Sequence, residues 1–136
     1  EKMISGKQLH GLKVLDKNGI VLGVVQDLLA DKQSGIIKGF IINLPGFIST
    51  LAFLSGQDVL SMDLSGMIVA DKSCLKRMSK AKQQDRSSLR MGEIETAKGY
   101  ITDILLEPDR ISAVEISQGV LNDIRVGRQT IPWDEV

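Results

Sequence analysis

The chain has 136 residues, with 17 Lys and Arg, 17 Asp and Glu, one Cys and one His, and 43% of its residues are hydrophobic. This length suits one ordinary domain or two very small ones, and the apolar fraction is enough for a packed core, which excludes a disordered chain. The zero net charge argues against a protein that coats nucleic acid, and the single thiol, Cys74, excludes an internal disulfide or a multi-thiolate zinc site, so we expect no metal and no cofactor.

The first half of the chain is patterned as short strands between turns. Apolar and β-branched runs predict strands at Leu12–Leu15, Val21–Ala30, Ile36–Asn43, Leu51–Phe53 and Met67–Val69. Lys17-Asn18-Gly19 predicts a tight primed hairpin turn, because Asn and Gly tolerate a positive φ, and Gln33-Ser34-Gly35 predicts a second reversal. The longest apolar stretch, Leu44–Leu54, has eleven residues, which is too few for a bilayer-spanning helix.

The middle of the chain is basic. Residues 71–91 carry seven Lys and Arg against two Asp, whereas residues 1–70 are neutral and residues 92–136 carry a net charge of −5. We interpret this stretch as a linker that is solvated or forms a short amphipathic helix, with Asp71 as its N-cap and with Leu75 and Met78 on one face. A phosphate or membrane contact is the third interpretation, although no aromatic side chain is present there to stack on bases.

An internal repeat is the strongest signal in the sequence. Gly23–Leu29 matches Gly99–Leu105 at an offset of 76, with the glycine and the aspartate in identical places. Two shorter matches follow, Gly39–Ile42 with Ala113–Ile116 at an offset of 74 and Leu54–Val59 with Ile131–Val136 at an offset of 77.

In the second copy, the alternation over Ser112–Ser117 predicts a strand. It places Ala113 and Glu115 on a solvated face and Val114 and Ile116 on a buried face.

The repeated residues Gly23, Asp27, Gly99 and Asp103 allow two interpretations. Paired carboxylates can divide acid and base roles in catalysis. An aspartate at the same site of each copy is better explained as an acceptor for backbone N–H groups where one strand turns into the next. The glycines suit a strand kink or a close backbone crossing, and we expect His10 at a surface or turn position. We therefore predict no catalytic residues.

The residues around the first copy resemble a known family. Lys7–Val14, Asp16–Gly19, Leu22–Leu29 and Gly39–Ile42 are similar to the PRC-barrel domain, which is named for the photosynthetic reaction centre H subunit and also occurs in the ribosome maturation factor. The second copy, from Leu89 to Val136, is similar in its Gly-x-x-x-Asp element and in its closing Ile-Pro-aromatic-acidic segment. The resemblance implies a small barrel for protein interaction or assembly, without catalysis, in the cytoplasm or at the cytoplasmic face of a membrane.

The predicted fold is all-β, with two tandem small PRC-type β-barrels at residues 1–70 and 89–136 and a basic, partly helical linker at 71–88. The second copy stops at Val136, which matches Val59, so it lacks a counterpart of Leu60–Val69. Either a missing tail closes the second barrel or that barrel borrows a strand from elsewhere. An unpaired strand edge would favour a homodimer.

We predict a non-enzymatic, cytoplasmic adaptor that binds protein partners, which the sequence does not identify. The first alternative is a ribosome-assembly or RNA-associated factor that uses the basic linker, and the second is a peripheral membrane or photosynthetic-complex assembly protein at the inner membrane face. The candidate interaction residues are Phe47, Leu51, Phe53, Lys76, Arg77, Lys80, Lys82 and Trp133. Trp133 is either an interface anchor or part of the core.

Overall fold

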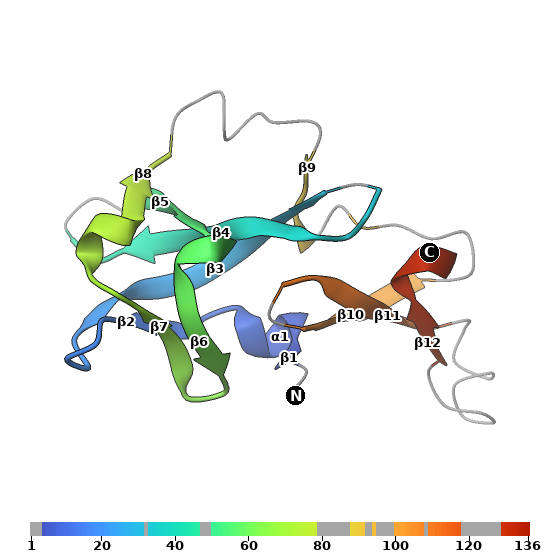
Figure 1. The fold of residues 1–136 in the computed structure, drawn as a ribbon. Coiled ribbons are helices and arrows are strands. Elements are labelled where there is room, and N and C mark those ends of the chain that lie inside the picture. The colour runs from blue at the N-terminus through green and yellow to red at the C-terminus, as the bar shows by residue number, and fades with distance from the viewer. Residues whose placement is uncertain are drawn as a thin grey trace.

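The computed structural model of the chain describes residues 4–31, 33–46, 50–78, 88–91, 94, 100–107, 109–117 and 129–136. Within these ranges the regular structure is almost entirely β-strand, arranged in two sheets, with one α-helix of four residues and short 3-10 helices (Figure 1). The all-β prediction is confirmed. No helix in the described ranges is long and apolar enough to cross a membrane.

The first sheet has the strand order β6-β7-β2-β3-β4-β5-β8, with β9 paired to the far end of β3. Its strands are β2 (Lys13–Leu15), β3 (Val21–Asp31), β4 (Ile37–Leu44), β5 (Thr50–Ser55), β6 (Val59–Asp63), β7 (Gly66–Val69), β8 (Leu75–Arg77) and β9 (Ser88–Leu89). All neighbouring pairs are antiparallel except β2 and β7. The five strands predicted in this region are present, and β6, β8 and β9 are additional.

The short connection between β5 and β6 makes the first sheet curl. Only the 3-10 helix η1 (Gly56–Asp58) joins these strands, although four other strands separate them in the sheet order. In a flat sheet they would lie about 24 Å apart, whereas the chain from Ser55 to Val59 spans at most about 14 Å. Curling brings the two ends together around a core whose fully buried side chains include Phe40, Leu28 and Leu54.

The second sheet has four strands in the order β1-β10-β11-β12. They are β1 (Ile4–Ser5), β10 (Tyr100–Leu106), β11 (Ile111–Ser117) and β12 (Gln129–Pro132). This sheet borrows β1 from the start of the chain, as one of the two sequence-based alternatives proposed, through the pairs Ile4–Leu106 and Ser5–Leu105. Within the described residues this sheet has four strands and no counterparts of β2, β6 and β7, so the second barrel stays a prediction.

The two sheets exchange short segments. While β1 joins the second sheet, β9 joins the first by pairing Leu89 with Ala30. Ala30, which pairs with β9, and Leu106, which pairs with β1, are 76 residues apart, which is the offset of the sequence repeat. The two short strands therefore pair at equivalent places of the two sheets. The helix α1 (Gly6–Leu9) follows β1 and begins with a capping box between Ser5 and Gln8. One apolar cluster extends through both sheets, so the two sheets share a core.

The first hairpin turn differs from its prediction. Gly19 has a φ of +82°, but no residue other than glycine has a positive φ among those described, so Asn18 does not adopt the primed conformation. The Gly19 N–H donates to the Asp16 carbonyl, and the Asp16 carboxylate accepts the N–H groups of Asn18 and Ile20. A side chain therefore stabilises an ordinary turn that is followed by one left-handed glycine.

The start of the basic stretch is also different from its prediction. Asp71 caps η2 (Lys72–Cys74) by accepting the Ser73 N–H, as expected of an N-cap. Beyond Cys74 the chain forms β8 on the edge of β5, so Leu75 lies in a strand and not on one face of a helix with Met78. An available sheet edge overrides weak helical periodicity over so few residues. The domain boundaries at 70 and 89 stay a prediction, although strands β8 and β9 on either side of the linker both belong to the first sheet.

The alternation of buried and solvated side chains predicted for β11 (Ile111–Ser117) is observed for the buried face but not for the solvated face. Val114 and Ile116 are fully buried and Glu115 is half-buried. Ala113 is buried as well, because it lies between Leu105 of β10 and Pro132 of β12.

Candidate interaction site at the junction of the sheets

Asp27 attaches the segment after β9 to the first sheet. It lies at a β-bulge, where the register of β3 against β4 shifts between Val25 and Asp27. Its Oδ1 accepts the N–H of Leu28 at 2.8 Å and the N–H of Met91 at 3.0 Å. The half-buried carboxylate therefore stabilises its own bulge and holds a segment that lies far away in the sequence.

Asp103 has the corresponding position in the second sheet. The register of β10 against β11 shifts between Ile101 and Asp103. Its Oδ1 accepts the N–H of Ile104 at 2.8 Å and the N–H of Lys7 at 3.3 Å. Each repeated aspartate thus binds the segment that the other half of the chain contributes.

Replacing Asp27 or Asp103 with alanine should lower the free energy of unfolding by about 1–3 kcal/mol, because each change leaves two backbone N–H groups without their acceptor. Asp134→Ala, at an exposed position, is the control and should have little effect. Denaturant unfolding of the three variants measures these losses. A large loss for one aspartate and none for the other would contradict their equivalence.

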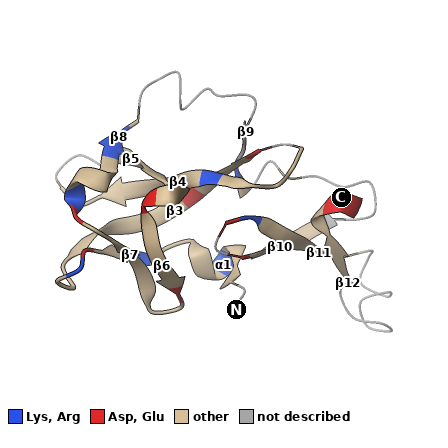
Figure 2. Ribbon diagram, viewed as in Figure 1, with Lys and Arg blue, Asp and Glu red and all other residues tan. Residues whose placement is uncertain are grey.

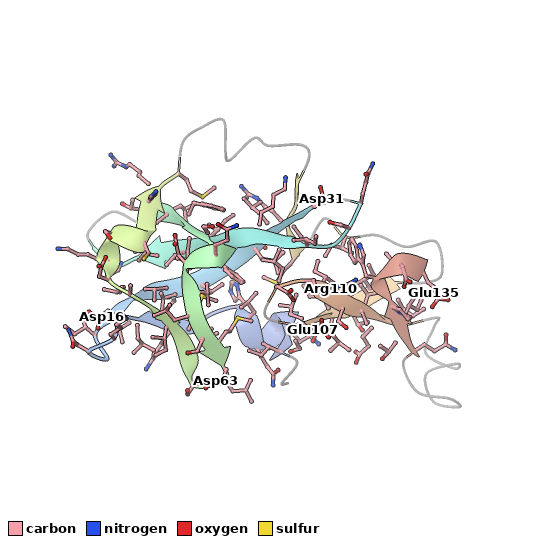
Figure 3. The ribbon with its side chains drawn as sticks, viewed as in Figure 1. Asp16, Asp31, Asp63, Glu107, Arg110 and Glu135 are labelled. Atoms are coloured by element: carbon pink, nitrogen blue, oxygen red, sulfur yellow. The ribbon has the colours of Figure 1, made fainter. Side chains whose placement is uncertain are left out.

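A second connection between the sheets is made by the β3–β4 hairpin. The Ile111 N–H donates to the Gly35 carbonyl at 2.8 Å, and the Ile37 N–H donates to the Asp109 carbonyl at 2.9 Å. Ile36 also forms an isolated bridge with Arg110, and Figure 3 shows Arg110 and Asp31 on the elements that meet there.

Asp31 orders the turn of this hairpin. Its carboxylate accepts the N–H groups of Gln33 and Ser34 and the Ser34 hydroxyl. The hydrogen bond from the Ser34 N–H, and to a smaller extent the one from the Ser34 hydroxyl, hold the pKa of Asp31 below its ordinary value. The carboxylate therefore stays ionised while it organises the turn that touches the second sheet.

Trp133 closes this connection from the second sheet. It begins the 3-10 helix η4 (Trp133–Glu135) and is only 7% exposed. Its indole N–H donates to the Gln33 carbonyl at 3.3 Å, and its ring belongs to the shared apolar cluster. Trp133 therefore serves an internal contact between the two sheets.

A cavity of about 410 Å³ lies beside the Asp103 attachment. It is lined by Gly6, Lys7 and His10 from the α1 segment, by Met91, and by Ile101, Thr102, Asp103 and Ile104 from β10. The lining combines apolar side chains with a few polar groups, a composition typical of binding sites. His10 is exposed, and its Nδ1 donates to the Gln26 carbonyl at 2.9 Å, which holds the imidazole against β3 of the first sheet.

The remaining predicted residues do not gather at this junction. Leu51 and Phe53 are half-buried on β5 against a separate small cluster of Leu29, Ile41 and Met78. Lys76 and Arg77 are exposed on β8, which is coloured blue for Lys and Arg in Figure 2. Gly23 is buried on β3, where a Cβ would lie 2.8 Å from the Asn43 carbonyl oxygen. Phe47, Lys80, Lys82 and Gly99 lie outside the described residues.

Sequence reasoning missed the lining of the cavity. Lys7 lies in the segment that resembles the PRC-barrel domain, and Ile101 and Thr102 lie in the repeated segment Gly99–Leu105, but none of them was predicted to line a binding site. His10 was expected only at a surface or turn. One sequence signal was available: the second copy has fewer residues before Gly99 than the first copy has before Gly23, which leaves less chain to cover the edge of β10. No group of three or more His, Cys, Asp or Glu residues that could hold a metal ion occurs in the part of the chain that the structure describes.

The curled first sheet and the second sheet, which shares its core, define a small protein of the β-barrel class. The family model of the PRC-barrel domain matches residues 1–73, more than half of the chain, and the chain belongs to this family. The match runs from the N-terminus into η2 and covers one copy, without the strands from β8 onward. A comparison with curated proteins found no match.

Proposed function

We propose that this chain is a non-catalytic interaction and assembly module that binds protein partners in the cytoplasm or at the inner face of a membrane. Its membership of the PRC-barrel family supports a role of this type. The observation that carries the proposal is the cavity at the sheet junction, whose lining offers apolar contact area together with polar side chains. The repeated carboxylates beside it are occupied by backbone N–H donors, which suits a scaffold.

We also infer that residues 89–136 are a second, incomplete PRC-type unit. Two pairs of register shifts at corresponding places support this inference. In the first pair, the extra residue lies just before Asp27 in β3 and just before Asp103 in β10. In the second pair, the extra residue lies in the partner strand, β4 opposite Leu29–Ala30 and β11 opposite Leu105–Leu106. The reciprocal exchange of β1 and β9 has the symmetry expected of two related units.

The experiment for the adaptor function is affinity purification of the tagged full-length protein from its native cells, with and without ribonuclease. We expect a reproducible set of proteins that resists ribonuclease. Lys76→Glu combined with Arg77→Glu is a useful comparison, because both side chains are exposed and the double variant should keep the same partners.

Two results would contradict the adaptor function. Loss of the partners after ribonuclease, together with loss in the double charge variant, would favour the RNA-associated alternative, since phosphate contacts depend on Lys and Arg. Recovery only with membrane lipids, released by salt and without any specific protein partner, would favour the peripheral membrane alternative.

A further inference from the structure

The edge of β3 in the first sheet is covered by the chain's own residues. The Val25 N–H donates to the Leu12 carbonyl at 2.8 Å, and the Gly11 N–H donates to the Val25 carbonyl at 2.7 Å. The strand β2 continues this pairing with Val14 opposite Gly23. As a result, Val25 is only 1% exposed.

Within the described part of the chain, the corresponding edge of β10 is open at Ile101. Ile101 pairs with Ile116 of β11 as Val25 pairs with Ile42 of β4, so its backbone N–H and C=O point away from β11. Among the described residues no strand pairs with Ile101 on that side, and its side chain is half-buried. The neighbouring part of this edge is covered, because β1 pairs with Leu105 and Leu106.

The sequence explains why this edge lacks a β2-like strand. Since β1 and β9 occupy equivalent places, the buried Leu9 corresponds to the buried Ile94, five residues after the paired Ile4 and Leu89. Thirteen residues separate Leu9 from Gly23, and they contain β2 and its turn. Only four residues separate Ile94 from Gly99, which is fewer than a two-residue turn and a three-residue strand require.

The junction cavity lies along this open edge. Ile101, Thr102, Asp103 and Ile104 form its β10 side, and Gly6 and Lys7 of α1 form another side. The helix α1 lies beside β10 (Figure 1). Ile101, Ile104 and Met91 give it apolar contact area beside the polar residues Lys7, His10, Thr102 and Asp103. An unpaired strand beside an apolar cavity is the arrangement that proteins use to bind an extended peptide by strand addition.

We propose that the β10 edge at Tyr100–Thr102 binds an extended peptide segment of a protein partner as an additional antiparallel strand. This inference rests on the proposed interaction function and specifies its site and the chemistry of its partner. The first sheet shows the required pattern, because Leu12 and Val14 of the covering segment are buried while Lys13 between them is exposed. The partner segment therefore carries apolar residues at alternate positions with polar residues between them.

The chain itself supplies a suitable probe. A blocked peptide with the sequence of residues 10–16, His-Gly-Leu-Lys-Val-Leu-Asp, is titrated into the isotope-labelled full-length protein, and amide chemical shifts are followed by NMR. We expect saturable shifts at residues 100–102. The control peptide with aspartate at the Val14 position should bind at least about tenfold more weakly, because it cannot bury that side chain in the apolar site. Absence of saturable shifts, or equal binding of both peptides, would overturn the proposal.

Hydrogen exchange of the free protein tests whether the edge is available. The Ile101 amide should exchange much faster than the Val25 amide and should become protected when the peptide is added. Protection of Ile101 equal to that of Val25 at every protein concentration would mean that the chain covers its own edge. Protection that disappears on dilution would assign the edge to a second copy. Either outcome would overturn the proposal.

A protein variant separates this site from the general function. Ile101→Glu should abolish peptide binding, whereas Ile20→Glu, at a side chain that is 59% exposed, should leave it unchanged. If Ile101→Glu does not fold, the titration and exchange measurements on the unmodified protein decide the question. If the folded Ile101→Glu variant still retains its partners in affinity purification, the interaction function holds but does not use this site. Peptide binding without any specific cellular partner would contradict the function and not the site.

Discussion

Gly35→Ala is expected to lower the free energy of unfolding by about 2–5 kcal/mol, which is the sum of a left-handed backbone at about 1–2 kcal/mol and overpacking at about 1–3 kcal/mol. Gly35 has a φ of +74°, and a Cβ there would lie 2.6 Å from Nε1 and 2.7 Å from Cδ1 of Trp133. The rigid indole is buried in the shared core and cannot move away easily. The alanine methyl should therefore push Trp133 off the hairpin.

Gly19 and Gly11 provide matched controls for this substitution. Their φ values of +82° and +86° are close to that of Gly35, but a Cβ at either would meet nothing within 4 Å. Their alanine variants should lose only about 1–2 kcal/mol, from the backbone alone. Denaturant unfolding gives the three losses, and the emission of Trp133, the single tryptophan, reports its exposure. Equal losses at the three positions would show that the contact of Gly35 with the indole contributes nothing.

The sequence predicts strands well where neighbouring residues determine them. The first sheet has long β-branched runs and strong turn residues, so its central strands lie close to their predicted bounds. The shared spacing of Gly23 with Asp27 and of Gly99 with Asp103 also indicates related strands. A two-residue strand such as β1 has no periodicity that a sequence could display. The strand β1 forms because it pairs with the edge of β10, which is a tertiary contact.

The candidate site depends on such choices between distant segments. An aspartate at a strand turn suggests a backbone acceptor, but the sequence does not indicate that the donors are Met91 for Asp27 and Lys7 for Asp103, which lie 64 and 96 positions away. Trp133 was ambiguous between core and interface for the same reason, since its hydrogen-bond partner Gln33 is 100 residues distant. Local propensity therefore determines where the strands form, whereas contacts between distant segments determine the structure of the junction.

The exchange of segments makes the two sheets depend on each other. A unit that lends its first strand to its neighbour cannot complete its own edge alone, and the continuous apolar cluster gives neither sheet a separate core. Among the described strands this dependence also places an open strand edge at the junction, because β1 covers only one end of β10. A rigid junction is a suitable base for a binding edge, since the strand that receives the peptide is held in place beforehand.

Ile4→Ala should lower the free energy of unfolding by about 2–5 kcal/mol, because Ile4 is 1% exposed and truncating a buried aliphatic side chain leaves a cavity. Ile20→Ala is the matched control at a 59% exposed side chain and should change stability by no more than about 0.5 kcal/mol.

Ile4 lies on β1 in the second sheet but enters the core that both sheets share, so its loss should destabilise the whole molecule in one step. Trp133 emission reports the second sheet and its contact with the hairpin, whereas far-ultraviolet circular dichroism is dominated by the larger first sheet. We expect the two probes to give the same midpoint in the unmodified protein and in the Ile4→Ala variant. A fluorescence transition that precedes the dichroism transition in the variant would show that β1 stabilises only the second sheet, and that the first sheet folds without it.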